Sequence, residues 1–521
     1  MRLTSVYQIP CNQGGLNHNP NIDMIPSVAM VHPSRNINLN EGGRKSRGGT
    51  SKVNASAGYG GARTVGAYDF RLQNGNQFQV VATADGKIWK DTTTTIKTGW
   101  TIDKHVSFSV MNNVLYICNG ANRPQVWDGS AASTSDLTNI PTDWVGTSFP
   151  FQMVVHGKGA SERMWAIGAK PNTIYASKLN NGIAEADFSD ANVLTFYIET
   201  GDNKGITGGV EFGDRLIVFS KRQAYMIDDT STNTAYWGYY KAPWTGGLAN
   251  YNLIVKTPND LIAMTDDGDI YSVVAVESYG DYKAASIVRS AFLDRWIREY
   301  INLTEIGNFH AVYNPTLNYI DFFMVYKKPG VTNNNLALRY FINLGPLGGW
   351  MPQDNQSHAS GYDASCSFLW KVSEGKYEIR TGDYSGYIWK LETANKNDDG
   401  NGYYAGFKTP HMPFGDARTT KHYKRTRVVC EPRGNWNIQV KTWVDGNYKG
   451  AQNIVLGDVG AVLDEFVLDT DVLGGQELTD TSFENENVGK RVQYEIYNST
   501  AGETFFISNI MVDFKPVGVR L

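Results

Sequence analysis

A weak repeat of apolar strand, tight turn and second strand constrains this chain more than any other feature of its sequence. In two copies an Asp-Gly pair separates apolar runs: residues 80–89 read VVATADGKIW, and residues 261–271 read LIAMTDDGDIY. Asp-Gly between alternating apolar residues is the strongest short-range sign of a β-hairpin, because a type I′ turn needs a positive φ at both central residues. Both segments are therefore predicted to be hairpins with type I′ turns, each ending in an aromatic residue.

More diverged copies of this unit fill most of the chain between residues 62 and 395. Anchored on the second strand, most copies lie about 40–50 residues apart, which is the period of a four-stranded propeller blade. About seven copies can be counted. A third clear copy ends at residues 386–390, and the diverged copies lie at residues 114–128, 164–176, 216–227 and 319–342.

The repeat predicts an all-β protein built around a β-propeller of about seven blades. A single four-stranded sheet cannot bury both of its faces, whereas sheets packed radially cover one another. Aromatic residues make up 12% of the chain, and they suit the wedge-shaped space between such sheets. We expect the aromatic residues that end the hairpins to be buried there as structural residues: Trp89, Trp127, Tyr271 and Trp389.

Two flanking regions differ from the repeat. Residues 1–60 are rich in Asn, Gly, Pro and Ser and are predicted to form an extended N-terminal arm, before a propeller over residues 61–400. Residues 401–521 contain strand-like runs that alternate apolar and polar residues, which predicts a C-terminal antiparallel, β-sandwich-like domain. Residues 284–300 form the best helical candidate, a short insertion between blades.

The arm carries a charge that contrasts with a segment near the C-terminus. Residues 1–63 hold seven basic and two acidic residues, giving +5, whereas residues 450–489 hold nine acidic and no basic residues, giving −9. Such charges usually mark solvated faces, but they also fit a docking pair between neighbouring subunits. On the second interpretation the arm orders against a partner, and its deletion over residues 2–50 leaves the propeller folded. The predicted partner-binding residues are Arg44, Lys45, Arg47, Lys52, Leu16 and Ile22.

Several kinds of chemistry are not expected. The net charge of −4 disfavours a protein that coats nucleic acid. The four cysteines are far apart and without a CxxC pair, so free thiols are expected, and no metal or cofactor site is predicted. No apolar run is long enough to span a membrane. The chain is not predicted to be an enzyme, since it lacks the GxSxG and HExxH motifs.

A resemblance to a known family adds a function. The motifs GGLNHNP at 14–20, INL at 37–39 and GGRKSRGG at 42–49 resemble the opening of tail proteins from tailed phages. The segments NRPQVWDG at 122–129 and KHYKRTRV at 421–428 extend the resemblance over most of the chain. The class it most resembles is the tail nozzle, or hub, of short-tailed phages.

The resemblance implies a structural protein of the virion tail, made in the host cytoplasm. Members of the family form homo-oligomeric rings, usually hexamers, below the portal and the adaptor proteins, and they carry tail fibres or spikes. Genomic DNA passes through the lumen without tight binding, and the family supplies no catalytic residue.

Two alternatives remain open at this point. One is a peripheral tail protein that binds a receptor or a carbohydrate. The other is a propeller glycosidase, which needs two positioned carboxylates across a pocket. Residues 84–89 faintly resemble the Asp box of sialidases, but Gly follows Asp directly and Ile replaces the usual Ser or Thr before Trp.

Overall fold

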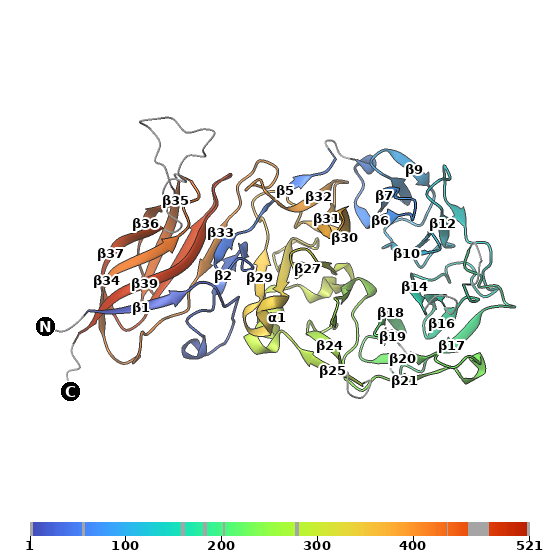
Figure 1. The fold of residues 1–521 in the computed structure, drawn as a ribbon, viewed down its shortest axis with the longest axis horizontal. Coiled ribbons are helices and arrows are strands. Elements are labelled where there is room, and N and C mark those ends of the chain that lie inside the picture. The colour runs from blue at the N-terminus through green and yellow to red at the C-terminus, as the bar shows by residue number, and fades with distance from the viewer. Residues whose placement is uncertain are drawn as a thin grey trace.

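The computed structural model describes residues 4–54, 58–157, 162–180, 185–201, 204–276, 281–434, 436–456 and 479–517. Its strands form a ring of four-stranded antiparallel sheets, beside which stands a two-sheet domain that contains the first and the last described strands (Figure 1). The predicted all-β propeller with a C-terminal antiparallel β domain is confirmed.

The ring contains seven four-stranded sheets, which we number as blades 1 to 7. Blade 1 contains β6 (Thr64–Arg71), β7 (Gln77–Thr83), β8 (Lys87–Lys90) and β9 (Thr94–Lys97). Blade 2 contains β10 (Ser107–Met111), β11 (Val114–Cys118), β12 (Gln125–Trp127) and β13 (Ser135–Asp136). Blade 3 contains β14 (Gln152–His156), β15 (Arg163–Lys170), β16 (Thr173–Ala176) and β17 (Leu194–Tyr197). Blade 4 contains β18 (Ile206–Phe212), β19 (Arg215–Ser220), β20 (Ala224–Asp228) and β21 (Gly238–Lys241). Blade 5 contains β22 (Ile254–Lys256), β23 (Asp260–Met264), β24 (Ile270–Val276) and β25 (Asp281–Ser286). Blade 6 contains β26 (His310–Asn314), β27 (Tyr319–Met324), β28 (Leu336–Phe341) and β29 (Trp350–Gln353). Blade 7 contains β30 (Ala364–Ser373), β31 (Lys376–Asp383), β32 (Ile388–Thr393) and β5 (Gly49–Lys52).

Each predicted hairpin forms the two middle strands of a blade. In the first, Val81 pairs with Trp89 between β7 and β8. The predicted turn type is wrong, because only Gly86 of the turn residues has a positive φ, of 78°. Residues 84–86 instead make a three-residue loop in which Thr83 accepts a 3.0 Å bond from the Gly86 N–H, and such a loop needs only one left-handed residue.

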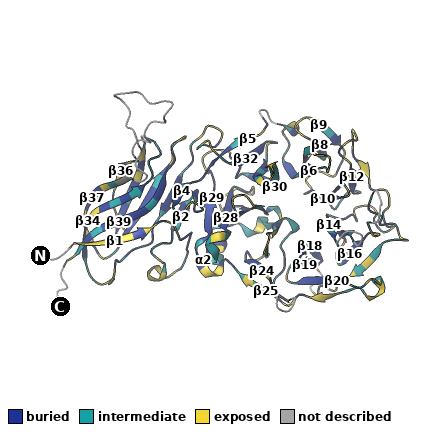
Figure 2. Cartoon of the chain, in the orientation of Figure 1, coloured by how far each residue is buried: buried dark blue, intermediate teal, exposed yellow. Residues whose placement is uncertain are grey.

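Apolar clusters fill the spaces between neighbouring blades. The cluster between blades 1 and 2, for example, contains Val80, Leu115 and Trp127. Buried residues follow the strands, and exposed residues gather mainly in connecting segments and outer strands (Figure 2). Each sheet therefore covers its neighbour, as the repeat predicts.

The C-terminal domain is a β-sandwich, which includes four strands from the N-terminal arm. One sheet contains β1 (Ser5–Pro10), β3 (Ile37–Asn38), β4 (Arg44–Ser46), β39 (Phe506–Pro516), β34 (Lys421–Cys430) and β37 (Thr479–Gly489). The other contains β2 (Val31–Arg35), β33 (Ala405–Lys408), β38 (Val492–Asn498), β35 (Asn437–Val444) and β36 (Asn447–Val455).

The arm is therefore built into the molecule, which corrects its predicted role. The described residues of the arm, 4–54 and 58–60, supply strands to both sandwich sheets and the fourth strand of blade 7. Deleting residues 2–50 would remove the four strands that the arm contributes to the sandwich and part of β5 in blade 7. The propeller is therefore not independent of the arm. The acidic segment at residues 450–489, which was predicted to dock with the arm, lies mostly outside the described residues.

The helices are short. They are α1 (Leu293–Tyr300), α2 (Gly345–Gly348) and single turns at Ile22–Met24, Tyr59–Gly61, Thr234–Tyr236, Tyr251–Leu253, Arg289–Ala291, Leu303–Asn308 and Ile342–Leu344. The predicted helical insertion begins later than expected, because residues 284–286 belong to β25. In the part of the chain that the structure describes, no helix is long and apolar enough to cross a membrane.

Candidate functional site: the junction between propeller and sandwich

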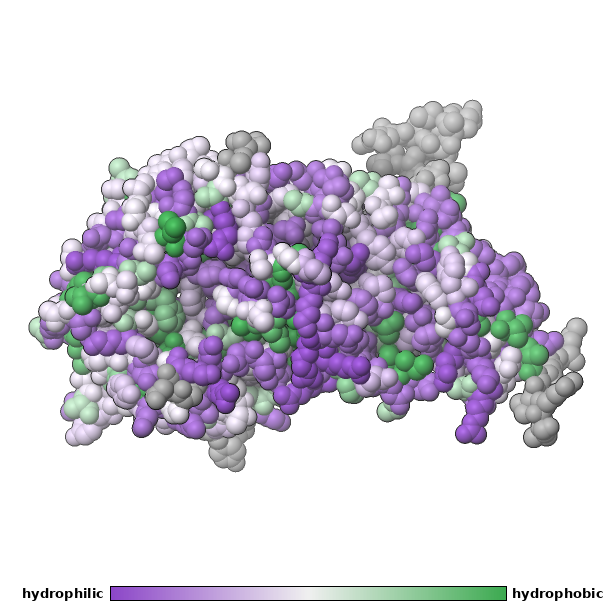
Figure 3. All heavy atoms as spheres, turned by 180° about the vertical axis from the view of Figure 1, so that it is seen from behind, coloured by the Kyte–Doolittle hydropathy of each residue, from purple (hydrophilic) through white to green (hydrophobic). Residues whose placement is uncertain are grey.

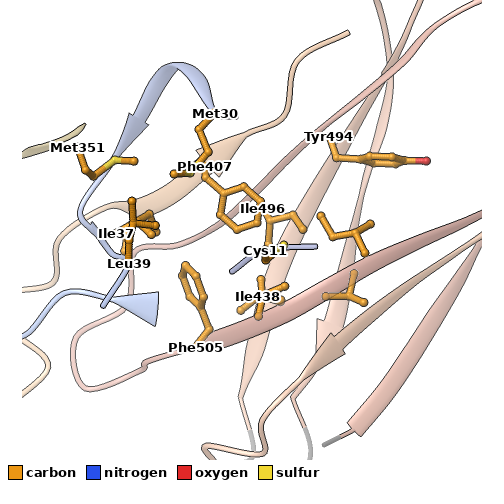
Figure 4. Close-up of a cluster of buried hydrophobic side chains, with 14 of the residues drawn as sticks. Cys11, Met30, Ile37, Leu39, Met351, Phe407, Ile438, Tyr494, Ile496 and Phe505 are labelled. Carbon is orange, nitrogen blue, oxygen red and sulfur yellow. The ribbon is translucent and has the colours of Figure 1, made fainter. Parts of the chain in front are cut away.

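The chain crosses between the propeller and the sandwich twice, and the two crossings lie side by side. Residues 47–48 lead from β4 of the sandwich to β5 of blade 7, and residues 394–404 lead back from β32 to β33. Figure 4 shows part of the apolar core at this junction, where Met30, Ile37 and Leu39 of the arm lie between Met351 of blade 6 and Phe407 of the sandwich.

Glycines of the arm allow the two crossings to touch. A Cβ atom on Gly49 would lie 2.0 Å from the Asn395 carbonyl oxygen, and one on Gly48 would lie 2.7 Å from the Cα of Glu392. Real Cβ atoms do not approach other atoms so closely, so a larger residue would force the backbones apart. The last two glycines of the GGRKSRGG motif, Gly48 and Gly49, are thus explained by close packing of backbones.

Arg47 ties the crossings together through a buried ion pair. Its guanidinium donates to both carboxylate oxygens of Asp398 at 2.9 and 2.7 Å, and both side chains are fully buried. It also lies 3.7 Å from the ring centre of Tyr403. Burial alone would lower the pKa of Arg47, but the Asp398 carboxylate raises it above its ordinary value, so the pair stays charged.

A second buried arginine extends this network into blade 6. Arg339 of β28 makes a bidentate pair with Asp321 of β27, at 2.8 and 2.9 Å. It also contacts Glu392 of β32, whose other oxygen accepts the Gly48 N–H at 2.8 Å. Burial opposes the charge on Arg339, but these carboxylates raise its pKa well above the ordinary value. We call Arg47, Asp398, Arg339, Asp321 and Glu392 the junction network.

The predicted partner-binding residues lie in or near this junction, and most of them are satisfied within the chain. Arg44 and Arg47 are fully buried, and Leu16 is 1% exposed, so the prediction that they face a partner is wrong for these three. Arg44 lies over the Phe407 ring at 4.4 Å and donates to the Val28 carbonyl at 2.6 Å. The covering surface that the arm's apolar residues require is supplied by its own chain.

The remaining three predicted contacts are nearer the surface. Lys45 pairs with Glu41 at 2.5 Å, and Lys52 pairs with Asp399 at 2.9 Å. Ile22 is 43% exposed. Lys45 and Lys52 are thus held in ion pairs within the chain, whereas Ile22 is an exposed apolar side chain.

The predicted blade aromatics are buried, with one difference. Trp127, Tyr271 and Trp389 are each under 5% exposed, whereas Trp89 is only half-buried. The indole N–H of Trp389 donates to Asp383 at 2.9 Å, and that of Trp89 donates to Thr83 at 3.0 Å. In both hairpins the indole therefore bonds back to the end of the preceding strand.

The propeller axis holds a small polar cavity of about 250 Å³. The first strands of several blades line it, with His310 of β26 among them. Burial lowers the pKa of His310 to about 3, and its ring nitrogens meet Ser367 Oγ at 2.8 Å and the Ala364 carbonyl at 3.1 Å. The cavity is smaller than pockets that hold drug-sized ligands, so a DNA duplex cannot pass through a single propeller.

Sequence reasoning missed the acidic half of the junction. Asp398, Glu392 and Asp321 look like ordinary turn or surface residues, and no motif marks them. The described residues contain no group of three or more His, Cys, Asp or Glu side chains arranged to hold a metal ion, and the four cysteines are buried and form no disulfide.

No protein-family model and no curated protein match the chain. Among solved structures it is similar to the β-propeller domain of Swd1 from Myceliophteria thermophila, at 10% identity and a TM-score of 0.43, over 66% of this chain and 100% of that domain. It is also similar to the N-terminal domain of Nup159, at 10% identity and a TM-score of 0.35, over 67% and 94% of the two chains. An exo-β-1,3-galactanase from Phanerochaete chrysosporium is 11% identical, with a TM-score of 0.26, over 80% and 97%. With TM-scores this low the strand pairing carries the fold assignment, and none of these proteins supplies a function.

Proposed function

We propose that the chain is a structural subunit of a short-tailed phage tail, a nozzle or hub in which copies form a ring below the portal and adaptor. The observation that carries this proposal is the convergence of the motifs behind the family resemblance. GGLN at 14–17 and GGRKSRGG at 42–49 both end in the junction, where Gly15 abuts Trp350 and Arg47 pairs with Asp398. These motifs serve to fix the sandwich to the propeller.

A rigid two-domain subunit suits a ring that must keep its shape while DNA passes through it. The lumen would lie between copies, since the cavity of a single propeller is too small. The net charge of −4 suits a conduit, because a lumen that neutralised phosphates would hold the DNA. On the face shown in Figure 3 hydrophilic residues dominate and hydrophobic ones lie in small separate groups, so ring contacts through this face would be polar.

The test is to locate the protein in a particle. Phage lacking this gene would be complemented with a tagged copy, and particles would be imaged by electron microscopy with a label on the tag. We expect a ring of labels on the tail axis, with six copies the family value. Labels on peripheral fibres, or no labels in particles, would overturn the proposal and favour the receptor-binding alternative.

Binding to DNA gives a second test. The isolated protein should bind duplex DNA only weakly at physiological salt. A dissociation constant below about 1 μM at about 150 mM salt would contradict a conduit and indicate a DNA-handling protein.

A further inference from the structure

A pocket of about 540 Å³ opens between blades 3 and 4, away from the junction and the propeller axis. Its walls come from the β14–β15 end of blade 3, the β18–β19 turn and the connection from β20 to β21. The volume is in the range that holds small organic ligands.

The wall from blade 3 carries polar groups that the chain leaves unsatisfied. His156 and Arg163 lie opposite each other on β14 and β15, and are 5% and 7% exposed. The His156 Nδ1 and the Arg163 Nε have no hydrogen-bond partner among the described residues. Leaving a buried polar atom unpaired costs about 1–3 kcal/mol, so a ligand that pairs with these two atoms gains that free energy.

The wall from blade 4 supplies acceptors, hydroxyls and an aromatic ring. Asp229 pairs with His156 at 3.1 Å, and Glu211 and Asp214 line the same wall. Hydroxyls of Thr230, Ser231, Thr232 and Thr234 and the half-buried ring of Trp237 complete it. Arg163 lies 5.1 Å from the centre of the Trp237 ring.

Exposed tyrosines lie on the outer strands of the same two blades. Tyr236, the residue before Trp237, is 76% exposed, and Tyr197 at the end of β17 is 64% exposed. Tyr239 and Tyr240 of β21 are 36% and 42% exposed. In Figure 1 these strands lie on the side of the propeller away from the sandwich. Aromatic residues gathered at a surface commonly serve recognition.

The lining selects among ligand classes. A phosphate or nucleotide needs several cations, but the described residues that line this pocket include one arginine and three carboxylates. An organic cation on Trp237 would lie beside the Arg163 guanidinium, which would repel it. A purely apolar ligand would leave the buried His156 Nδ1 and Arg163 Nε without a partner.

A neutral polyhydroxyl ligand meets all of these demands. Each hydroxyl both donates and accepts, so it can bond to the Asp229 carboxylate, the His156 Nδ1 and the Arg163 Nε–H together. The apolar face of a sugar ring can pack on the half-buried Trp237 ring. We propose that the pocket between blades 3 and 4 binds a neutral carbohydrate of one to three sugar units. Such binding goes beyond a structural role in a ring and does not require it.

The experiment uses the full chain and an array of neutral mono- to trisaccharides of hexoses, deoxyhexoses and N-acetylhexosamines, with hits measured by calorimetry. We expect at least one sugar to bind, and Trp237→Ala and Asp229→Asn each to weaken that binding at least about tenfold. Trp237→Phe keeps a flat ring and should retain most of the affinity. Tyr448→Ala, at a 56% exposed tyrosine on the sandwich, is the matched control and should change nothing.

Asp229→Asn keeps the shape of the side chain, so it carries the test if Trp237→Ala disturbs folding through the ring contact of Trp237 with Trp165. Three outcomes would overturn the inference. These are no binding of any sugar up to about 10 mM, binding that neither variant weakens, or binding of inorganic phosphate or ATP in place of sugars. None of these outcomes bears on whether the chain forms a tail ring.

Discussion

The blades and the junction are held together by different forces acting over different lengths of chain. Within a blade the hydrogen bonds are local, as between the Trp89 indole N–H and Thr83 six residues away, and apolar packing joins neighbouring sheets. At the junction the decisive contact is an ion pair between residues 351 positions apart, Arg47 and Asp398. The propeller can therefore tolerate variation in each blade, while the junction depends on a few charged groups that must all be present.

The buried charges make the junction depend on single partners, which the blades do not. Removing one partner of a buried pair leaves the other charge without compensation, which costs about 3–5 kcal/mol. A buried apolar side chain in a blade is surrounded by many weak contacts, none of which depends on a single partner. This difference can be tested from both sides.

The largest effect is expected from Arg47→Ala. It leaves the Asp398 carboxylate buried and unpaired, so the free energy of unfolding should fall by about 3–5 kcal/mol. Because Arg47 joins the two crossings, we also expect the propeller and the sandwich to unfold in separate steps in urea, followed by tryptophan fluorescence and circular dichroism.

The matched control is the double variant Arg47→Met with Asp398→Asn. It removes both charges, and the Asn oxygen can still accept the Thr50 N–H bond that Asp398 accepts at 3.0 Å. We expect it to be more stable than Arg47→Ala alone. If the double variant were as unstable as the single one, the ion pair would not be the reason for the loss.

The loss of stability expected in the blades is similar at a fully buried tryptophan and smaller at a half-buried one. Trp389 is 1% exposed, so Trp389→Ala should cost about 3–5 kcal/mol through lost burial and a cavity. Trp89 occupies the equivalent position in blade 1 but is half-buried, so Trp89→Ala should cost about half as much. Thermal and urea unfolding of both variants would measure the difference, and equal losses would mean that the wedge is not what stabilises the blades.

The comparison also explains what the sequence could predict. The hairpins at 80–89 and 261–271 were predictable because strand, turn and aromatic lie within about ten residues of one another. The turn type was not, because an extra loop residue changes the backbone without changing the Asp-Gly pattern. Local pattern thus predicted the element and its partner strand, but not the details of the loop.

The candidate site could be predicted only in part. Arg44 and Arg47 lie in a polar, glycine-rich segment, which is typical of a surface loop, and nothing nearby indicates that they are buried. Leu16 and Ile37 were correctly expected to need covering, but the covering side chains lie hundreds of residues away in the same chain. A long-range ion pair such as Arg47–Asp398 leaves no periodic signal, so one sequence cannot show it.

The smallest effect, at the edge of the junction, concerns pH. Asp363 lies just before β30, and its carboxylate accepts the Ser360 N–H at 2.9 Å. Burial raises the pKa of Asp363 to about 7, and the nearby charges of Asp354 and Asp398 add to the rise, while the Ser360 bond opposes it. The same carboxyl has a pKa of about 3.9 in an unfolded chain. Between pH of about 4 and 7 the folded protein thus keeps a proton that the unfolded chain has released, so this group lowers stability as pH rises through that window.

Asp363→Asn removes the titration and keeps an acceptor for Ser360. We therefore expect wild type and variant to be equally stable near pH 4 and the variant to be more stable near pH 8, with the difference growing between them. Urea unfolding at matched pH values measures that difference, in which the opposite pH dependence of His310 cancels because both proteins carry it. A difference that stayed constant with pH would show that Asp363 does not titrate in this range, and would leave the junction without a pH-dependent group at this edge.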